Sequence, residues 1–463
     1  MKQKHIQHLY WRASFGVDVK DLSTLKLKSK SKIVSNLFSD SEAYTPLELD
    51  LSEFSEVKFK SRKELKKQFS GEEIQKIRNK QNKKIRELNY AWIDRLSEPN
   101  TVLREKMTLF WANVFVCRDN DIFNIQQYNN TLRTHSLGNF KDFVKTIAKE
   151  PAMIKYLNNK QNVKKRPNEN FARELLELFT LGVGNYTEND IKESARAFTG
   201  WSFNKKGEFK LRKKQHDYNK KTFFGKTGNF NGDDIIDIIL EQKKCAKFIC
   251  KKVYTYFVNP IIDEKRLEEI TNLFYKDYNI KNLMNHIFSS KWFYDEKNIG
   301  VKIKSPIELI TGINKIVPFT FQKKKQLYYL QKMMGQVLLY PNNVSGWKGD
   351  KYWIDSNTLM FRMKLPSLLL SNAIINLEEK GDFEDTFNNY YKRKNKGNKY
   401  LKTTKDWDSF TKEYGNLNPY ELKNLLINSK IDTDTDDLLN NLEVKSNKNY
   451  CVQLMSIPEY QLC

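Results

Sequence analysis

The sequence predicts a mainly α-helical protein with a large multi-helix globular core and one small irregular or hairpin insertion. Three observations lead to this fold class. The 463 residues include only 18 Gly and 11 Pro, so few positions interrupt a helix. Apolar residues recur every three or four positions along most of the chain, which is the spacing of one helix face. The hydrophobic content of 39% is sufficient for a buried core.

The first half of the chain shows the helical spacing most clearly. Residues 61–96 carry apolar side chains between charged ones, and Gly71 is expected to divide this stretch into two helices. The segment 101–115 is rich in large apolar and aromatic side chains, which predicts a core helix. Pro151 is expected to begin a further helix. Proline has no backbone N–H, but in the first turn of a helix this group has no partner within the helix, so its loss costs little.

The middle of the chain contains the most informative helix. Residues Asn168 to Leu181 form a strong helical pattern closed by Gly182, and Thr187 is expected to cap the next helix. Between 202 and 232 the sequence becomes aromatic, basic and glycine-punctuated, which predicts a small hairpin or ordered loop.

The domain organisation follows from changes in composition. Residues 1–370 are expected to form one helical domain that includes the insertion near 202–232. Residues 371–463 are expected to form peripheral C-terminal helices and a basic loop, because 391–405 carries seven Lys or Arg and no acid.

The chain is strongly basic, with 80 Lys and Arg against 56 Asp and Glu and a formal net charge of +24. Cations concentrate in the segments 58–87, 205–221 and 391–405. Such a segment can be the solvated face of a helix or an anion-binding face. No nucleic-acid recognition motif is present, so any binding to nucleic acid is expected to be salt-sensitive and without sequence specificity.

Cysteines and apolar runs restrict the cellular setting. Five widely separated cysteines are an odd number in a long chain, so free thiols are expected. The sequence has no run of 18 apolar residues and no signal-peptide pattern, so we expect no transmembrane segment and a cytoplasmic location. With five histidines and no C-x-x-C motif, a closed zinc site is not expected, while oxygen-ligand metals and the cofactor stay open.

The helix from 168 to 181 combines apolar side chains over most of its circumference with several charges, so we expect it to be buried nearly all round. Asn170, Glu174 and Glu177 share one face, and Arg173 stands on a neighbouring ladder. Burying an unpaired carboxylate costs several kcal/mol, so partners are expected nearby. The candidate partners are Arg196, His135, Arg133 and Arg12. The pattern fits a structural ion-pair network as well as a catalytic or metal-binding pocket.

Two loops offer further candidate site residues. His216 and Asp217 lie in the irregular segment, where a histidine beside a carboxylate can act as a general base or a metal ligand. The turn-rich loop 341–347 contains Asn343 and Trp347, which can form a stacking wall for sugars or bases. The alternative for this loop is a folded segment held by its own aromatic rings.

Several motifs then occur in the order of a known family. They are His8 to Gly16, Met107 to Phe115, His135 to Phe140, Pro167 to Gly184, Ala195 to Trp201, His216-Asp217, Gly232 to Asp234, Lys304 to Leu309 and Pro341 to Trp347. On these motifs the sequence resembles the domain of unknown function 1800 family (DUF1800) over about residues 5–370.

The resemblance implies a largely helical bacterial protein and supplies no reaction. Many family members carry export signals. Their genes often neighbour those of a family that resembles phosphatase and sulfatase proteins, so the product of such a gene is a possible partner. This chain departs from the family at one motif. Where many members have Trp-His-Asn-His-Phe, it has Trp111-Ala112-Asn113-Val114-Phe115, so two imidazoles are absent.

Two hypotheses about function follow, and whether the protein is an enzyme stays open. The first is a hydrolase or transferase acting on an anionic or carbohydrate-type substrate in a buried Glu/His/Arg pocket. Its catalytic candidates are Glu174, Glu177, His135 and His216, and its substrate-binding candidates are Arg173, Arg196, Asp217, Asn170, Asn343 and Trp347. The alternative is a non-catalytic basic module that binds an anionic polymer or an acidic partner protein, in which case the basic segments are expected to share one face.

Overall fold

The computed structural model describes residues 1–58, 60, 62–98, 101–371 and 401–463, and it confirms the mainly α-helical fold class. Within these ranges the strands form three small antiparallel sheets of two strands each. No helix in the described ranges combines the length and apolar character that a membrane span requires.

The described residues divide into two compact units. The central unit comprises 37–290 and 338–347, and the terminal unit comprises 1–36, 291–337 and 348–463. Helix α3 (Lys30–Ser39) spans the boundary between them. The terminal unit joins segments that are far apart in sequence. The predicted domain boundary near residue 370 lies beside the undescribed residues 372–400 and stays a prediction.

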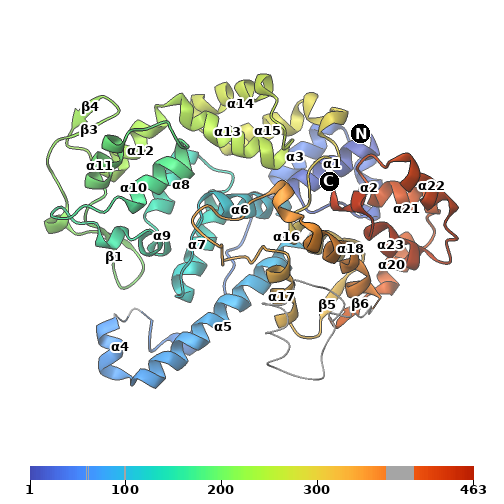
Figure 1. Cartoon of the computed structure of the whole chain (residues 1–463), viewed down its shortest axis with the longest axis horizontal. Helices are drawn as coiled ribbons and strands as arrows, with labels where there is room; N and C mark the ends of the chain where they lie inside the picture. Colours follow the sequence, from blue (N-terminus) through green and yellow to red (C-terminus); the bar gives the residue numbers. More distant parts are fainter. Residues whose placement is uncertain (59, 61, 99–100, 372–400) are drawn as a thin grey trace. The chain divides into compact units, whose positions relative to one another are not determined.

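The central unit is built from helices and two hairpins (Figure 1), and α13 and α14 lie side by side in it. Its helices are α4 (Arg62–Gln68), α5 (Gly71–Leu96), α6 (Val102–Val114), α7 (Ile122–His135), α8 (Phe140–Ala148), α9 (Pro151–Tyr156), α10 (Asn170–Glu174), α11 (Glu188–Ala197), α12 (Gly232–Leu240), α13 (Lys243–Phe257), α14 (Glu264–Asp277) and α15 (Ile280–Ser289). Shorter turns are η1 (Ser52–Phe54), η2 (Asn159–Gln161), the π-helical η3 (Leu175–Thr180) and η4 (Lys213–Gln215).

Several predicted helix ends are confirmed in the central unit. Gly71 begins α5 after a break from α4, and Ser70 caps α5 through a reciprocal capping box with Glu73. Pro151 is the first residue of α9. Thr187 caps α11 by accepting a hydrogen bond from the backbone N–H of Asp190.

The core of the central unit is aromatic, as the segment 101–115 predicts. The Trp111 ring contacts Phe115 and Phe143 at centroid distances of 5.6 and 5.3 Å. Phe115 also meets Phe179 of η3 at 5.7 Å, and all four side chains are buried. These contacts join α6 to α8 and to the segment that carries the candidate glutamates.

The segment 202–232 contains the two hairpins, which confirms the predicted insertion. Strand β1 (Trp201–Phe203) pairs with β2 (Phe209–Leu211), and β3 (Lys221–Phe223) pairs with β4 (Lys226–Gly228). Gly200 lies just before β1 with a φ of +77°, and a Cβ atom there would approach the Arg212 carbonyl oxygen to 2.8 Å. A glycine is therefore required where the segment before β3 crosses the end of α11.

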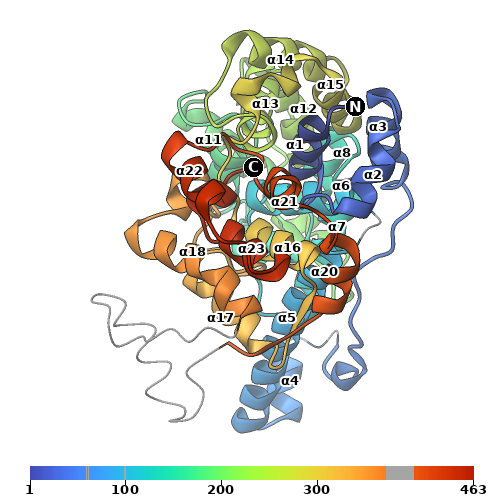
Figure 2. The same cartoon turned by 90° about the vertical axis from the view of Figure 1, so that its right-hand side faces the viewer.

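The terminal unit gathers helices from both ends of the sequence, and α23 packs against α18, α20 and α21 (Figure 2). Its helices are α1 (Gln3–Ala13), α2 (Val19–Lys26), α16 (Pro306–Ile316), α17 (Lys325–Met333), α18 (Ser356–Leu370), α20 (Trp407–Tyr414), α21 (Pro419–Leu426), α22 (Thr433–Asn441) and α23 (Asn447–Met455). It also contains β5 (Phe319–Phe321) paired with β6 (Thr403–Lys405), and the turns η5 (Trp292–Tyr294), η6 (Glu296–Asn298), η7 (Asp350–Trp353) and η10 (Pro458–Gln461).

The five cysteines are free thiols, as predicted, and all of them are buried. Cys117, Cys245 and Cys250 belong to the central unit, and Cys451 and Cys463 to the terminal unit. Burial raises the pKa of Cys245 to about 12, because a thiolate is poorly solvated in an apolar environment.

Candidate functional site

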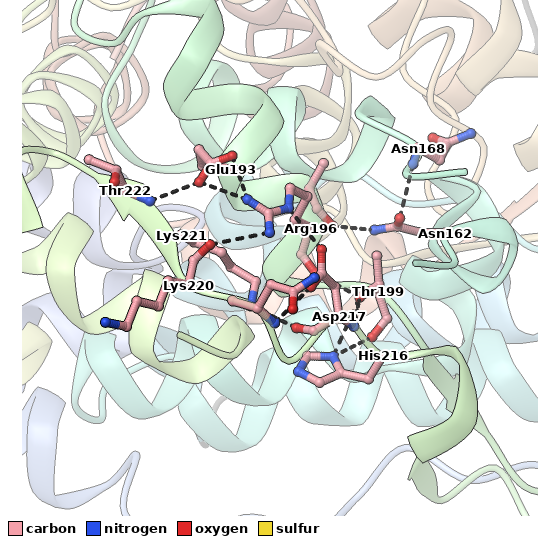
Figure 3. A network of polar contacts seen from close by, with 12 residues as sticks. Asn162, Asn168, Glu193, Arg196, Thr199, His216, Asp217, Lys220, Lys221 and Thr222 are labelled. Carbon is pink, nitrogen blue, oxygen red and sulfur yellow. Dashed lines mark hydrogen bonds and ion pairs between the residues drawn. The ribbon is translucent and has the colours of Figure 1, made fainter. Parts of the chain in front are cut away.

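His216 and Asp217 lie between β2 and β3, where the chain crosses the end of α11 (Figure 3). The Arg196 Nε donates to Asp217 Oδ2 at 2.8 Å. The Asp217 backbone N–H donates to Thr199 Oγ1 at 2.8 Å, and His216 Nδ1 lies 2.8 Å from the Thr199 carbonyl oxygen. These contacts bring together three of the predicted site residues, namely Arg196, His216 and Asp217.

The contact with Thr199 determines the tautomer of His216. A carbonyl oxygen only accepts hydrogen bonds, so Nδ1 carries the proton and donates it. The side chain is 3% exposed, and its ring meets Tyr218 edge-on at 4.7 Å. Nε2 is therefore the nitrogen that carries no proton in the neutral imidazole.

Each of the three side-chain nitrogens of Arg196 donates to an acceptor of the protein itself. Its Nη1 donates to both carboxylate oxygens of Glu193 at 2.8 and 3.0 Å, and its Nη2 donates to the Lys220 carbonyl at 3.2 Å. Burial alone would raise the pKa of Asp217. The hydrogen bonds from Arg196 and from the Asn219 backbone, together with the nearby positive charges, outweigh burial, so the pKa of this carboxyl is lowered overall. In this arrangement Arg196 positions the His216 segment.

Lys221 fixes the same segment, and Asn162 links α11 to the loop before α10 (Figure 3). Lys221 is buried, and its Nζ donates to the carbonyls of Asp217 and Asn219 at 2.7 and 2.9 Å. Asn162 donates to the Ala195 carbonyl at 2.8 Å and accepts from the Asn168 N–H at 2.9 Å. The His216 segment, α11 and the loop before α10 are thereby held as one rigid network.

The candidate glutamates lie where α10 passes into the wider π-helical turn η3. Glu177 accepts a hydrogen bond from the Tyr186 hydroxyl at 3.0 Å. Glu174 is half-buried and makes no hydrogen bond or ion pair with a residue in the described ranges. Burial and the Glu177 charge raise its pKa. The Glu174 charge also contributes to the raised pKa of Tyr156, after burial and the charge of Cys117.

The prediction that this helix is buried nearly all round is wrong for its charged face. The side chains of Glu169 and Arg173 are each 37% exposed. Arg173 donates to Glu188 at 3.0 and 2.9 Å and to Glu169 at 3.2 Å. Leu178 is also only half-buried, so the apolar side chains cover one side of the helix and leave the other to a solvated ion-pair network. Asn170 is half-buried at its first turn.

The other three candidate partners of the glutamates, His135, Arg133 and Arg12, lie elsewhere. His135 ends α7 and stacks on Phe143 with a centroid distance of 5.5 Å, and burial lowers its pKa. Arg133 forms a buried ion pair with Glu105 at 2.5 Å. In the terminal unit Arg12 donates to Cys463 Sγ and to the Asn298 carbonyl. In the described ranges no hydrogen bond, ion pair or ring contact joins His135, Glu174 and His216 to one another.

The loop 341–347 docks on the end of α6. The Trp347 N–H donates to Asn113 Oδ1 at 2.7 Å, and Asn113 Nδ2 donates back to the Trp347 carbonyl at 3.0 Å. The Trp347 indole is 5% exposed, and Asn343 is exposed within the turn. Asn113 stands between Ala112 and Val114, which are both buried.

The structure also contains a groove in the central unit that the sequence-based candidates do not include. Its volume is about 900 Å³, and residues from α4, α5, the start of α7, the end of α9, η2 and the β1–β2 turn line it. Seven lining residues are cationic, and the carboxylates of the lining are Asp119 and Asp121. The cations are Lys60, Lys66, Arg78, Lys155, Lys160, Lys205 and Lys206.

The lining cations differ in how firmly the protein holds them. Lys155 pairs with the buried Asp119 at 2.6 Å, and Lys160 lies 4.5 Å above the Phe203 ring. Burial lowers the pKa of Lys160, and the charges of Lys155 and Arg212 lower it further. Like charges crowd this end of the groove, so an anionic ligand relieves repulsion there.

Three other cations of the groove have no partner of their own. Lys66, Arg78 and Lys206 make no ion pair with any described residue. They come from α4, α5 and the β1–β2 turn, so two of the three basic segments meet at one concave surface. Residues 391–400 of the third basic segment lie outside the described residues. The sequence signal for this groove is the excess of Lys and Arg in 58–87 and 205–221.

The fold and the site thus define a mainly α-helical protein with a rigid histidine loop and a cationic groove. The chain belongs to the family described as protein of unknown function (DUF1800), whose model matches residues 8–462. Comparison with curated proteins and with solved structures yields no match.

Proposed function

We propose that the protein binds an anionic polymer in the groove of the central unit. The observation that carries this proposal is the meeting of seven cations with two carboxylates on one concave surface of about 900 Å³. A volume of this size is typical of ligand sites. The excess of positive charge attracts an acidic chain and holds it at several points.

The binding free energy of such a site comes from many weak ion pairs and depends on the salt concentration. A single exposed ion pair contributes about 0–1 kcal/mol, because solvent screens it and ordering of both partners costs entropy. Once the first contact has brought a polymer to the groove, the further contacts form within the same complex. The affinity therefore grows with the number of contacts. Screening at high ionic strength weakens all of them.

The geometry favours binding over catalysis at the predicted site residues. Glu169, Arg173 and Glu188 form a solvated network, and Arg196 is paired with Asp217 and Glu193. A charge that is buried without a partner is costly, and its presence would suggest a role in chemistry. These side chains are paired or solvated, so this cost is small for them.

A pair of charge reversals tests the binding proposal. Lys160→Glu combined with Lys206→Glu is expected to weaken binding of fluorescent dextran sulfate by at least about tenfold. The matched control reverses Lys265 and Lys276, which are exposed on α14 outside the groove. Fluorescence anisotropy measures the affinity of both double variants for dextran sulfate, and circular dichroism checks that both are folded. Equal losses in the two double variants would show that net charge alone drives binding and would contradict the proposal.

A second candidate function is the hydrolase or transferase activity on an anionic or carbohydrate-type substrate. The observation that favours it is the half-buried Glu174, which has a raised pKa and no partner in the described ranges. Such a carboxyl suits a general acid, with Glu177 as its neighbour.

The matched variants for this candidate are Glu174→Gln and Glu169→Gln. A screen of chromogenic esters and glycosides identifies a substrate first. Loss of at least about 100-fold in kcat is then expected for Glu174→Gln. Glu169→Gln is expected to change kcat by less than about twofold, because that carboxylate faces solvent beside Arg173. Equal kcat in the Glu174→Gln variant and the parent protein would exclude Glu174 as the acid.

A further inference from the structure

The groove carries as many amide side chains as cations. Seven amides line it, and they come from α5, from the segment before α7, from α7 itself and from the β1–β2 turn. They are Gln75, Gln81, Asn82, Asn120, Asn124, Gln127 and Asn204. An amide both donates and accepts hydrogen bonds, whereas a phosphate or sulfate oxygen only accepts them. This composition matches a ligand that offers hydroxyl groups as well as negative charges.

Part of this amide set is free to meet a ligand. Gln81, Asn82 and Asn120 make no side-chain hydrogen bond with a described residue. Asn124 donates to Asp119 at 2.8 Å, and Gln127 donates to Glu150 at 3.0 Å, so these two belong to the scaffold. The unengaged amides lie along α5, near Arg78, and before α7, where Asn120 stands between Asp119 and Asp121.

The two carboxylates of the lining restrict the ligand further. Asp119 is buried beside Lys155, and Asp121 caps α7 by accepting the Phe123 N–H at 3.0 Å. Burial raises the pKa of Asp121. At these two positions a phosphate meets like charge, while a sugar hydroxyl can donate to a carboxylate. The ligand is therefore expected to have spaced rather than continuous charge.

The groove offers few aromatic rings for stacking of nucleic-acid bases. Its lining rings in the described ranges are Phe123 and Phe203, and each has a lysine over one face. Lys58 Nζ lies 5.4 Å from the Phe123 centroid, and Lys160 Nζ lies 4.5 Å from that of Phe203. Binding of single-stranded nucleic acid relies on open aromatic faces for base stacking.

From these observations we infer that the groove binds an acidic polysaccharide, that is, a chain of hydroxylated sugars with carboxylate or sulfate groups at intervals. The inference rests on the proposed function, because it names the ligand class of the same groove. The cations bind the acidic groups, and the free amides together with Asp121 bind the hydroxyl groups.

Isothermal titration calorimetry with four defined probes tests the ligand class. They are a heparin decasaccharide, a decagalacturonate, a polyphosphate of matched charge and a deoxythymidine decamer. At about 0.3 M NaCl, where electrostatic contacts are strongly screened, at least one glycan is expected to bind about tenfold or more tightly than polyphosphate and the decamer. The tighter of the two glycans identifies sulfate or carboxylate as the acidic group.

Amide variants provide the second measurement. Asn82→Ala combined with Asn120→Ala is expected to weaken glycan binding at least about fivefold and polyphosphate binding less than twofold. The control combines Asn229→Ala with Asn416→Ala, two exposed asparagines outside the groove, and is expected to change neither.

The outcomes separate this inference from the proposed function. If polyphosphate or the decamer binds as tightly as both glycans, the polysaccharide inference is overturned. In that case a loss of all binding in the Lys160→Glu, Lys206→Glu variant still supports an anionic-polymer site. If none of the four probes binds even at low salt, both the inference and the proposed function fail.

Discussion

Glu150 is a buried carboxylate behind the wall of the groove. It is 5% exposed and accepts hydrogen bonds from Thr131 Oγ1 at 2.6 Å and from Gln127 Nε2 at 3.0 Å. Burial outweighs these two donors and raises the pKa of Glu150 to about 7. Gln127 itself lines the groove, so this carboxylate is one residue removed from the groove surface.

The raised pKa predicts a specific dependence of stability on pH. The folded state holds the Glu150 proton more tightly than the unfolded state, whose pKa is near 4.5. This contribution to stability is fully present below about pH 4.5 and is lost as the pH rises through about 7. Glu150→Gln stays neutral, so at pH 8 it is expected to raise the free energy of unfolding by roughly 1–3 kcal/mol.

Urea denaturation at pH 4.5 and pH 8 measures this effect. At pH 4.5 the variant and the parent protein are expected to have equal stability, because the carboxyl is then neutral as well. Glu169→Gln is the control, since its solvent-exposed side chain is expected to show no such difference between the two pH values. A Glu150→Gln protein that is less stable at both pH values would disprove the burial argument.

At the scale of elements, Asn113 and the loop 341–347 show how a family motif is used in this chain. Gly346 has a φ of +77°, and a Cβ atom there would approach Asn113 Oδ1 to 2.3 Å and Val116 Cγ2 to 2.8 Å. Asn113, between the buried Ala112 and Val114, therefore serves to hold the loop.

Gly346→Ala is expected to destabilise the protein more than Gly184→Ala. Gly184 has a similar φ of +80°, but a Cβ atom there meets nothing within 4 Å. Both variants carry the backbone strain of about 1 kcal/mol, and only Gly346→Ala also separates Trp347 from Asn113. The difference in unfolding free energy is expected to be about 1–3 kcal/mol. Equal destabilisation of both variants would show that the loop docking contributes little.

The elements near the candidate site were predictable where local rules decide them. Gly71, Pro151 and Thr187 begin or cap helices as expected, because these preferences act within one turn. The burial of the helix 168–181 was not predictable from periodicity alone. The passage into a π-helical turn at Leu175 and the pairing of Arg173 with Glu188 depend on neighbours from another helix.

At the scale of the whole molecule, the fold class and the family follow from the sequence, while the groove does not. Its lining comes from segments between residues 57 and 207, and composition gives no information about which distant cations converge. The same holds for His216, Asp217 and Arg196, whose approach depends on Gly200 and the β1–β2 hairpin. Charge runs in a sequence indicate binding surfaces only when the topology brings them together.

The buried thiols have a practical consequence for the two compact units. No cysteine is open to reagent in the native protein, and each unit contains at least two of them. A maleimide dye can therefore react with these thiols only when the surrounding structure opens. Mass spectrometry of the labelled peptides distinguishes Cys117, Cys245 and Cys250 of the central unit from Cys451 and Cys463 of the terminal unit. The chain thus carries intrinsic reporters that allow the opening rate of each unit to be followed without an introduced label.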